Sequence, residues 1–202
     1  LRNIKNYNNG LGHPLTVLRL AADSTYDIAV LEMGMSTPLN EIARLCRITP
    51  PDVAVELNVL PVHIEHLGTI ENIAKAKAEL VEGMKAGGTA VLNADDERVA
   101  AMAPLSKGSV VTYGIREKAD ISASDLVFEG FGKTRFRLNT PTGSAEVVFP
   151  LNGTYSVMNA LAAAAAGHVF GMEAGDIAAA LSSVSAPPQR GEILQFAGGF
   201  TL

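Results

Sequence analysis

Three short runs of aliphatic residues, each followed by polar residues, constrain the fold of this chain most. They cover Tyr26 to Leu31, Asp52 to Leu57 and Thr89 to Leu92, and a fourth run follows at Val110 to Tyr113. Helical patterns separate the first three. Short buried strands that alternate with helices are typical of a parallel α/β sheet. We therefore predict an α/β fold, a mostly parallel sheet flanked by helices, with ligands beyond the carboxyl ends of its strands.

A small antiparallel lobe is expected in the second half of the chain. Apolar and polar side chains alternate in stretches between about residues 120 and 151, with turn signals at residues 130–132 and 141–143. Helices are predicted at Val157 to Phe170 and Ala174 to Ser182, and a final strand at Ile193 to Phe196. We expect one domain over residues 1–202, with the lobe inserted in it.

The composition argues against several classes of partner. The net charge is −5 and lysines and arginines form no cluster, which argues against nucleic acid and anionic membrane surfaces. The longest apolar run, residues 160–166, is far shorter than the roughly 20 residues of a membrane span, and no signal peptide is visible. The single cysteine, Cys46, excludes an internal disulfide. We expect no membrane span and a cytoplasmic location.

Lys77 occupies an unusual position for a lysine. The stretch from Thr69 to Met84 has helical periodicity, and Lys77 falls at the centre of its apolar stripe. A lysine there must extend its ammonium to solvent, meet a buried anion or be chemically modified. The sequence leaves these three alternatives open.

Polar side chains follow the predicted strands. Glu32 follows the first strand, and Asn93 and Asp95 follow the third. A carboxylate at a strand end suits Mg²⁺, and a surface acid is the alternative for Glu32. His63 lies in the loop after the second strand, where it is either a metal ligand or a structural histidine. A binding crevice at this edge of the sheet is therefore predicted.

Three further segments carry candidate ligand residues. Asn8 and Asn9 belong to a turn-rich loop ending at Thr16, which either presents amides to a phosphate or is an ordinary loop. Asn159, in the first turn of a predicted helix, either contacts an adenine edge or caps the helix. Arg190 is either a phosphate clamp or a solvated arginine. No G-x-x-x-x-G-K-[ST] loop is present, so these residues indicate only an α/β domain with a phosphate or magnesium crevice.

Together these motifs resemble the Mur ligases over essentially the whole chain, most closely the branch that adds D-alanyl-D-alanine to UDP-N-acetylmuramoyl-tripeptide. Tyr155 and Ser156 stand where that family has His-Asn, and Gln189 replaces the glycine before Arg190. The motifs that carry the resemblance are Asn8 to Thr16, Ala29 to Gly34 with Glu41, Ile42 and Leu45, His63 to Gly68 with Ile73, Ala74, Lys77 and Glu79, Asn93 to Asp96, and Gly153 to Ala160.

The resemblance implies a P-loop NTPase-like fold and an ATP-dependent amide ligase of peptidoglycan precursor synthesis. ATP would phosphorylate a carboxylate to an acyl phosphate, which the dipeptide amine would attack. Two Mg²⁺ ions would be bound, one by Glu32 and one by His63 and a carbamylated Lys77, and these three residues would be catalytic. The resemblance further implies cofactor-binding residues Asn93, Asp95, Asn159 and Arg190, and substrate-binding residues Asn8, Asn9 and Thr16.

The expected partners are UDP-N-acetylmuramoyl-tripeptide, D-alanyl-D-alanine and ATP, bound by a monomer. The family's phosphate loop would precede Asn8 by some tens of residues, and only seven residues stand before it. We therefore expect a truncated central domain that is inactive alone. One alternative is another amide ligase of the superfamily, such as a folylpolyglutamate or cyanophycin synthetase. Another is a noncatalytic binding module that has kept the fold.

Overall fold

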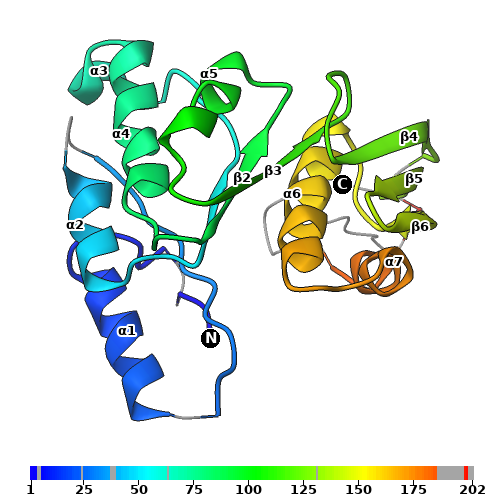
Figure 1. Cartoon of the computed structure of the whole chain (residues 1–202). Coiled ribbons are helices and arrows are strands. Elements are labelled where there is room, and N and C mark those ends of the chain that lie inside the picture. The colour runs from blue at the N-terminus through cyan, green and yellow to red at the C-terminus, as the bar shows by residue number, and fades with distance from the viewer. Residues whose placement is uncertain are drawn as a thin grey trace. The chain divides into compact units, whose positions relative to one another are not determined.

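The computed structural model describes residues 1–3, 6–23, 25–36, 40–62, 64–130, 132–185 and 198–199. Within these residues six strands form one sheet in the order β1-β2-β3-β4-β5-β6. β3 and β4 are parallel, and β4, β5 and β6 are antiparallel neighbours (Figure 1). The predicted α/β fold with an antiparallel β lobe is confirmed. The strands are β1 (Val53–Glu56), β2 (Thr89–Asn93), β3 (Ser109–Gly114), β4 (Ile121–Phe128), β5 (Thr134–Thr140) and β6 (Gly143–Phe149).

Helices connect and flank the strands. None of those in the described part of the chain is long and apolar enough to cross a membrane. The α-helices are α1 (Gly12–Ala22), α2 (Glu41–Ile48), α3 (Ile64–Leu67), α4 (Ile70–Glu82), α5 (Glu97–Ala100), α6 (Thr154–Val169) and α7 (Ala174–Ser182), and a 3₁₀ turn, η1, covers Ala103–Leu105.

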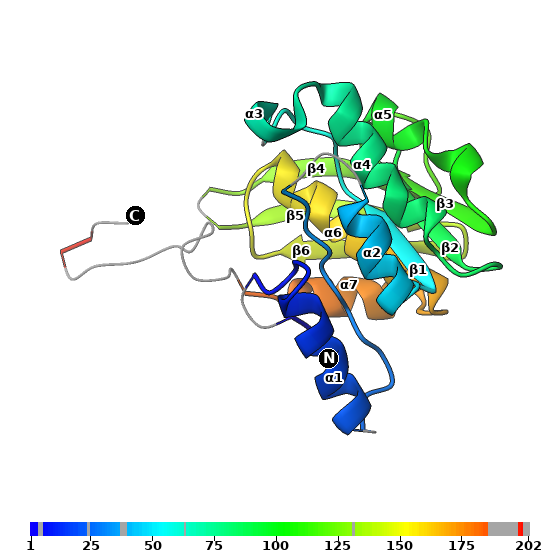
Figure 2. The same ribbon diagram turned by 90° about the vertical axis from the view of Figure 1, so that its left-hand side faces the viewer.

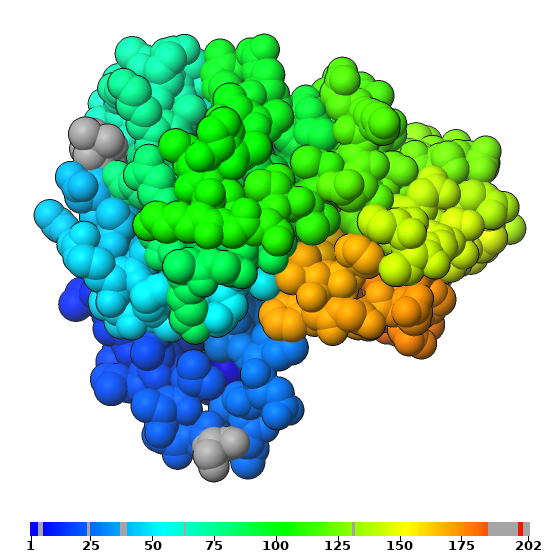
Figure 3. Space-filling model, viewed as in Figure 1, coloured from blue at the N-terminus to red at the C-terminus, as the bar shows by residue number. Residues whose placement is uncertain are grey.

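The chain forms two compact units. The first unit comprises residues 1–90 and 96–110, and the second comprises residues 91–95 and 111–202. In the first unit α2 packs beside α4 (Figure 2), and Leu45, Ile73 and Val81 from these helices are fully buried. α1 projects at the surface of this unit, coloured blue in Figure 3, and its residues Leu15 and Leu18 are exposed.

The second unit has its own core between the antiparallel strands and two helices. α7 packs against β5 and β6, and α6 packs against β4 and β5. The rings of Phe136 and Phe149 meet edge to face, with centroids 6.4 Å apart. Leu138 and Leu161 are fully buried beside them. Alternation of apolar and polar residues in β5 therefore reflects one buried and one exposed face, as predicted.

The predicted strand at Tyr26 to Leu31 is wrong. Among the described residues of this segment, one isolated parallel bridge joins Val30 to Arg2, and Val30 is 70% exposed. The backbone of Leu1 bonds Ile28 and Val30, but no ladder extends from there. The aliphatic composition is that of a buried strand, yet the segment has too few paired neighbours to form one. The strand predicted at Ile193 to Phe196 lies outside the described residues.

Candidate functional site

Lys77 pairs with a buried glutamate of the neighbouring strand. α4 begins at Ile70, after Thr69, whose side chain accepts a hydrogen bond from the Asn72 amide, and the helix buries Ile73 in the core. The Nζ atom of Lys77 lies 3.3 Å from Oε2 of Glu56, the last residue of β1. The two side chains are 24% and 4% exposed, respectively. Of the three alternatives for the Lys77 ammonium, the structure shows the second, in which it meets a buried anion, the carboxylate of Glu56.

Glu56 lies in a strongly desolvated position. Burial raises the pKa of Glu56 to about 7, and the Lys77 ammonium, which acts in the opposite direction, offsets only part of this effect. The carboxylate of Asp96 adds to the upward shift. Asp96 itself accepts a hydrogen bond from the Val59 amide at 2.7 Å and caps α5. The negative charge of Asp96 therefore opposes ionisation of Glu56, whereas the positive charge of Lys77 favours it.

The sequence prediction missed Glu56. A glutamate inside the aliphatic segment Val53 to Leu57 was the available signal, because a charged residue in a buried strand requires a partner. Its partner is 21 residues away in the chain, on a different element. Strand periodicity alone therefore does not identify the pair.

Glu32 lies next to the loop that leads into α1. The side-chain amide of Asn8 donates to Oε1 of Glu32 at 2.8 Å, and Asn3 accepts a hydrogen bond from the Glu32 backbone amide at 2.7 Å. Gly34 permits this approach, because a Cβ there would lie 2.7 Å from Asn8 Oδ1. The structure thus brings together two predicted residues, Asn8 as a substrate ligand and Glu32 as a metal ligand.

Asn9 and Thr16 make local hydrogen bonds that shape the same loop. The Asn9 side chain accepts hydrogen bonds from the amides of Leu11 and Gly12, at 3.1 and 2.9 Å, where α1 begins. The buried Thr16 hydroxyl donates to the Gly12 carbonyl at 3.0 Å. These contacts give both residues a role in holding the loop, whatever else they bind.

The structure places Asn159 differently from the prediction. α6 begins at Thr154, so Asn159 is exposed in the second helical turn and is too far along the helix to cap it. The capping alternative is therefore wrong. His63 and Arg190 lie outside the described residues. Within the described part of the chain, no three metal-ligating side chains gather into a cluster.

Asn93 and Asp95 organise the turn after β2. Oδ1 of the buried Asn93 accepts a hydrogen bond from the Asp95 amide at 2.9 Å. The Asp95 carboxylate accepts the amides of Ile115, Arg116 and Glu117 at 3.0, 3.1 and 2.8 Å. Burial alone would raise the pKa of Asp95, but these amides and the Arg116 guanidinium outweigh it and hold the pKa below its usual value. Asp95 therefore fixes the segment that follows β3.

Replacing Asp95 with asparagine should destabilise the protein by about 2 kcal/mol or more at pH 7, because charge-assisted bonds to three amides are weakened. The folded-state pKa is depressed, so this stabilisation is complete above the unfolded-state value of about 3.9 and is lost as the pH falls through the folded-state pKa. Urea unfolding at pH 7 and at lower pH measures the difference in stability between wild type and Asp95→Asn. The control is Asp176→Asn, which replaces an exposed carboxylate. A difference from wild type that is unchanged towards pH 3 would exclude this role.

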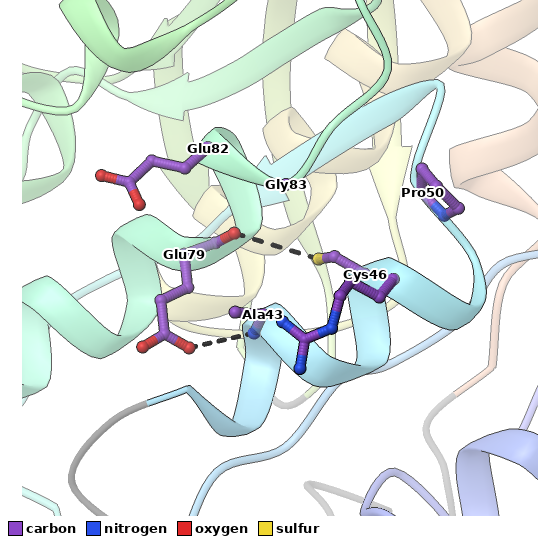
Figure 4. Close-up of a pocket in the computed structure, with 7 residues that line it drawn as sticks. Ala43, Cys46, Pro50, Glu79, Glu82 and Gly83 are labelled. Atoms are coloured by element: carbon purple, nitrogen blue, oxygen red, sulfur yellow. Dashed lines mark hydrogen bonds between the residues drawn. The ribbon is translucent and has the colours of Figure 1, made fainter.

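Glu79 of α4 caps the amino end of α2. Its Oε1 accepts a hydrogen bond from the Asn40 amide at 2.6 Å. Its Oε2 accepts one from the Ala43 amide at 3.0 Å, which Figure 4 shows. A carboxylate at this end also interacts favourably with the helix dipole. A cavity of about 290 Å³ lies beside it, lined in part by Cys46 and Arg47. Burial raises the pKa of Cys46 to about 11, so its thiol is protonated and unreactive at neutral pH.

Glu79→Gln should lower the free energy of unfolding by about 1–2 kcal/mol, because the charge that strengthens both bonds to α2 is removed. Chemical unfolding measures the change. Glu82→Gln, an exposed position on the same helix, is the matched control and should be near neutral. Equal stability of the two variants would show that Glu79 contributes nothing as a cap.

The fold defines the class of protein as an α/β domain, with a six-stranded sheet and flanking helices among the described residues. The Mur ligase middle domain matches residues 2–167, and the chain belongs to this family. Glu32, in the segment between α1 and α2, and Lys77, on α4, both lie within the matched region.

Known relatives are similar over nearly the whole of this chain. The UDP-N-acetylmuramoyl-tripeptide–D-alanyl-D-alanine ligase of Mycobacterium tuberculosis is 41% identical over 182 residues, which are 90% of this chain and 35% of that protein. MurF from Acinetobacter baumannii has a TM-score of 0.91 and 29% identity, covering 98% of this chain and 43% of that one. MurF ligase from Thermotoga maritima, solved in complex with ADP, has a TM-score of 0.84 and 28% identity. The match covers 98% of this chain and 45% of that chain. The chain thus spans less than half the length of these relatives.

Proposed function

We propose that this chain is the ATP- and magnesium-binding part of a MurF-type amide ligase, which joins D-alanyl-D-alanine to UDP-N-acetylmuramoyl-tripeptide. The observation that carries the proposal is the 41% identity to the M. tuberculosis ligase over 90% of this chain. ADP in the T. maritima relative supports a nucleotide site on this fold. Because the chain spans 35% of the first of these relatives, we assign the complete reaction to the full-length protein.

The reaction proposed is an amide synthesis in two steps. The γ-phosphoryl group of ATP passes to the terminal carboxylate of the tripeptide, and ADP leaves. The amine of the dipeptide then attacks the carbonyl carbon of the acyl phosphate, phosphate leaves with the electron pair of the broken C–O bond, and the nitrogen loses a proton to solvent. Activation is needed because a free carboxylate has a poor leaving group. We place this reaction in the cytoplasm, in a monomeric enzyme.

Glu32 fits the proposed metal site because its carboxylate is a hard oxygen donor held by Asn8 at 2.8 Å. His63 and a carbamylated Lys77 would hold a second cation. When bound, Mg²⁺ would neutralise charge on the transferring phosphoryl group. Asn8 would orient Glu32 as well as contact substrate, and Asn9 and Thr16 would keep the loop in place.

The residues proposed to contact the nucleotide belong to the second unit. Asn159 is exposed on α6, where its amide can contact an adenine edge. Asn93 and Asp95 would act by holding the backbone at the end of β2 and after β3, since their polar atoms already bond those segments. Arg190 would clamp a phosphate.

Product analysis by mass spectrometry tests this function. The full-length protein is incubated with ATP and Mg²⁺, either with UDP-N-acetylmuramoyl-tripeptide and D-alanyl-D-alanine or D-alanine, or with a folate and L-glutamate. We expect more amide product with D-alanyl-D-alanine than with either of the other amines. Glutamate addition to a folate would instead identify a folylpolyglutamate synthetase, and ATP binding without product from any amine would identify a noncatalytic module.

A further inference from the structure

His13 is the largest side chain that α1 buries. The helix has 11 residues, of which Gly12, His13 and Thr16 are buried, whereas Leu15 and Leu18 are exposed. The Thr16 hydroxyl donates to the Gly12 carbonyl of the same helix. His13, which is 0% exposed, is therefore the main side chain that holds α1 on the first unit.

The imidazole ring of His13 reaches the end of α2. Its Nε2 atom lies 3.0 Å from Oγ1 of Thr49, the residue that follows α2. The Thr49 backbone amide donates to the carbonyl of Leu45, whose side chain lies in the core of the unit. The contact therefore ties α1 to a fixed part of the first unit.

The other ring nitrogen of His13 favours the neutral form. Nδ1 is buried and has no hydrogen-bond partner among the described residues. A neutral imidazole leaves one nitrogen as a bare acceptor, whereas a protonated ring donates from both. Protonation would therefore bury a positive charge and place an N–H group where no described acceptor receives it, which is costly.

Neighbouring charges do not offset this cost. The charged or titratable residues nearest in α1, in α2 and in the segments beside them are Tyr7, Arg19, Glu41, Arg44, Arg47 and Asp52. Glu41 accepts a hydrogen bond from the Ser36 amide, and Asp52 pairs with Lys85. Among the described residues no carboxylate forms an ion pair with His13, and burial lowers the pKa of His13 below its usual value.

We propose that the contact between His13 and Thr49 docks α1 onto the first unit at neutral pH and releases the helix as the pH falls. In the released helix, water solvates the protonated ring. Because burial depresses the pKa of docked His13, docking is fully stabilised above the ordinary value of about 6.5 and weakens as the pH falls below it. Asn9 accepts hydrogen bonds from the amides of Leu11 and Gly12 at the start of α1, so the preceding loop loosens with the helix.

Hydrogen–deuterium exchange of the full-length protein, followed by mass spectrometry, tests this release. Exchange is compared at pH 7.5 and pH 5.5 after correction for the intrinsic pH dependence of amide exchange. We expect the protection of α1 to fall by about tenfold, because a released histidine with a pKa of about 6.5 takes up a proton over this range. The protection of α7 should stay constant as an internal reference. Equal protection of α1 at the two pH values would overturn the proposal.

Substitutions identify the titrating group. His13→Gln and His13→Phe remove the titration, so the loss of protection in α1 should disappear in each variant that thermal unfolding shows to be folded. His168→Gln replaces a histidine of α6 in the second unit and should behave as wild type. A tenfold loss that persists in a folded His13 variant would assign the effect to another group and overturn the proposal.

A consequence for activity rests on the proposed function, in which Asn8, Asn9 and Thr16 bind substrate. The KM of the full-length protein for UDP-N-acetylmuramoyl-tripeptide should rise several-fold from pH 7.5 to pH 5.5 and stay nearly constant in His13→Gln. An equal rise in both proteins would overturn this consequence.

The two measurements separate the inference from the function. Loss of protection in α1 without dipeptide-dependent phosphate release at pH 7.5 would overturn the proposed function and leave the inference intact. Dipeptide-dependent phosphate release by an enzyme whose α1 does not respond to pH would overturn the inference alone.

Discussion

Replacing Lys77 with alanine abolishes the ligase activity of the full-length protein, by an expected factor of at least about 100, and short carboxylates such as formate or acetate partly restore it. The reason is that a carbamate at this position would supply anionic oxygen ligands to a cation that stabilises the transferring phosphoryl group. A small carboxylate can enter the space left by the shortened side chain and supply the same oxygens. Phosphate release at saturating ATP measures both the loss and the rescue.

Lys75→Ala is the matched control for this experiment. Lys75 lies on the same helix but is exposed, so its removal should leave activity near the wild-type level. Full activity of Lys77→Ala would exclude carbamylation as a requirement. Loss of activity without rescue by any carboxylate would assign Lys77 a role as a cation paired with Glu56 instead.

Glu32→Gln should raise the Mg²⁺ concentration needed for half-maximal activity of the full-length protein by about tenfold or more if Glu32 holds the ion as proposed, because a neutral amide is a much weaker ligand for Mg²⁺. Glutamine retains an oxygen that can accept the hydrogen bond from Asn8, which is 2.8 Å long in the native protein, so the loop should keep its conformation. A magnesium titration of phosphate release measures the change.

Glu71→Gln serves as the control for the Glu32 variant, since it removes an exposed carboxylate of α4 in the same unit. Its titration should superimpose on that of the wild-type protein. An unchanged Mg²⁺ requirement in Glu32→Gln would remove Glu32 from the metal site, and Asn8 would then hold it for a structural reason alone.

Much of the fold could be predicted because it depends on local patterns. The aliphatic runs that became β1, β2 and β3 and the alternation in β5 are visible in the sequence. The segment from Tyr26 to Leu31 has the same composition and forms only one bridge. Strand formation requires a paired neighbour as well as a suitable composition, and a single sequence does not reveal which neighbours are present.

The candidate site was less predictable, because its contacts join distant parts of the chain. The sequence identified Lys77 as unusual and named a buried anion among its alternatives, but it did not name Glu56. Asp95 was predicted from its strand-end position, whereas its bonds to residues 115–117 depend on tertiary structure. An error of three residues in the start of α6 was enough to change the interpretation of Asn159.

The most direct test of the account is the release of phosphate from ATP by the full-length protein with UDP-N-acetylmuramoyl-tripeptide, with and without D-alanyl-D-alanine. The 202-residue chain is assayed alongside. The account predicts release that depends on the dipeptide in the full-length protein and is absent from the shorter chain. No release from the full-length protein, or release that does not respond to the dipeptide, would contradict it.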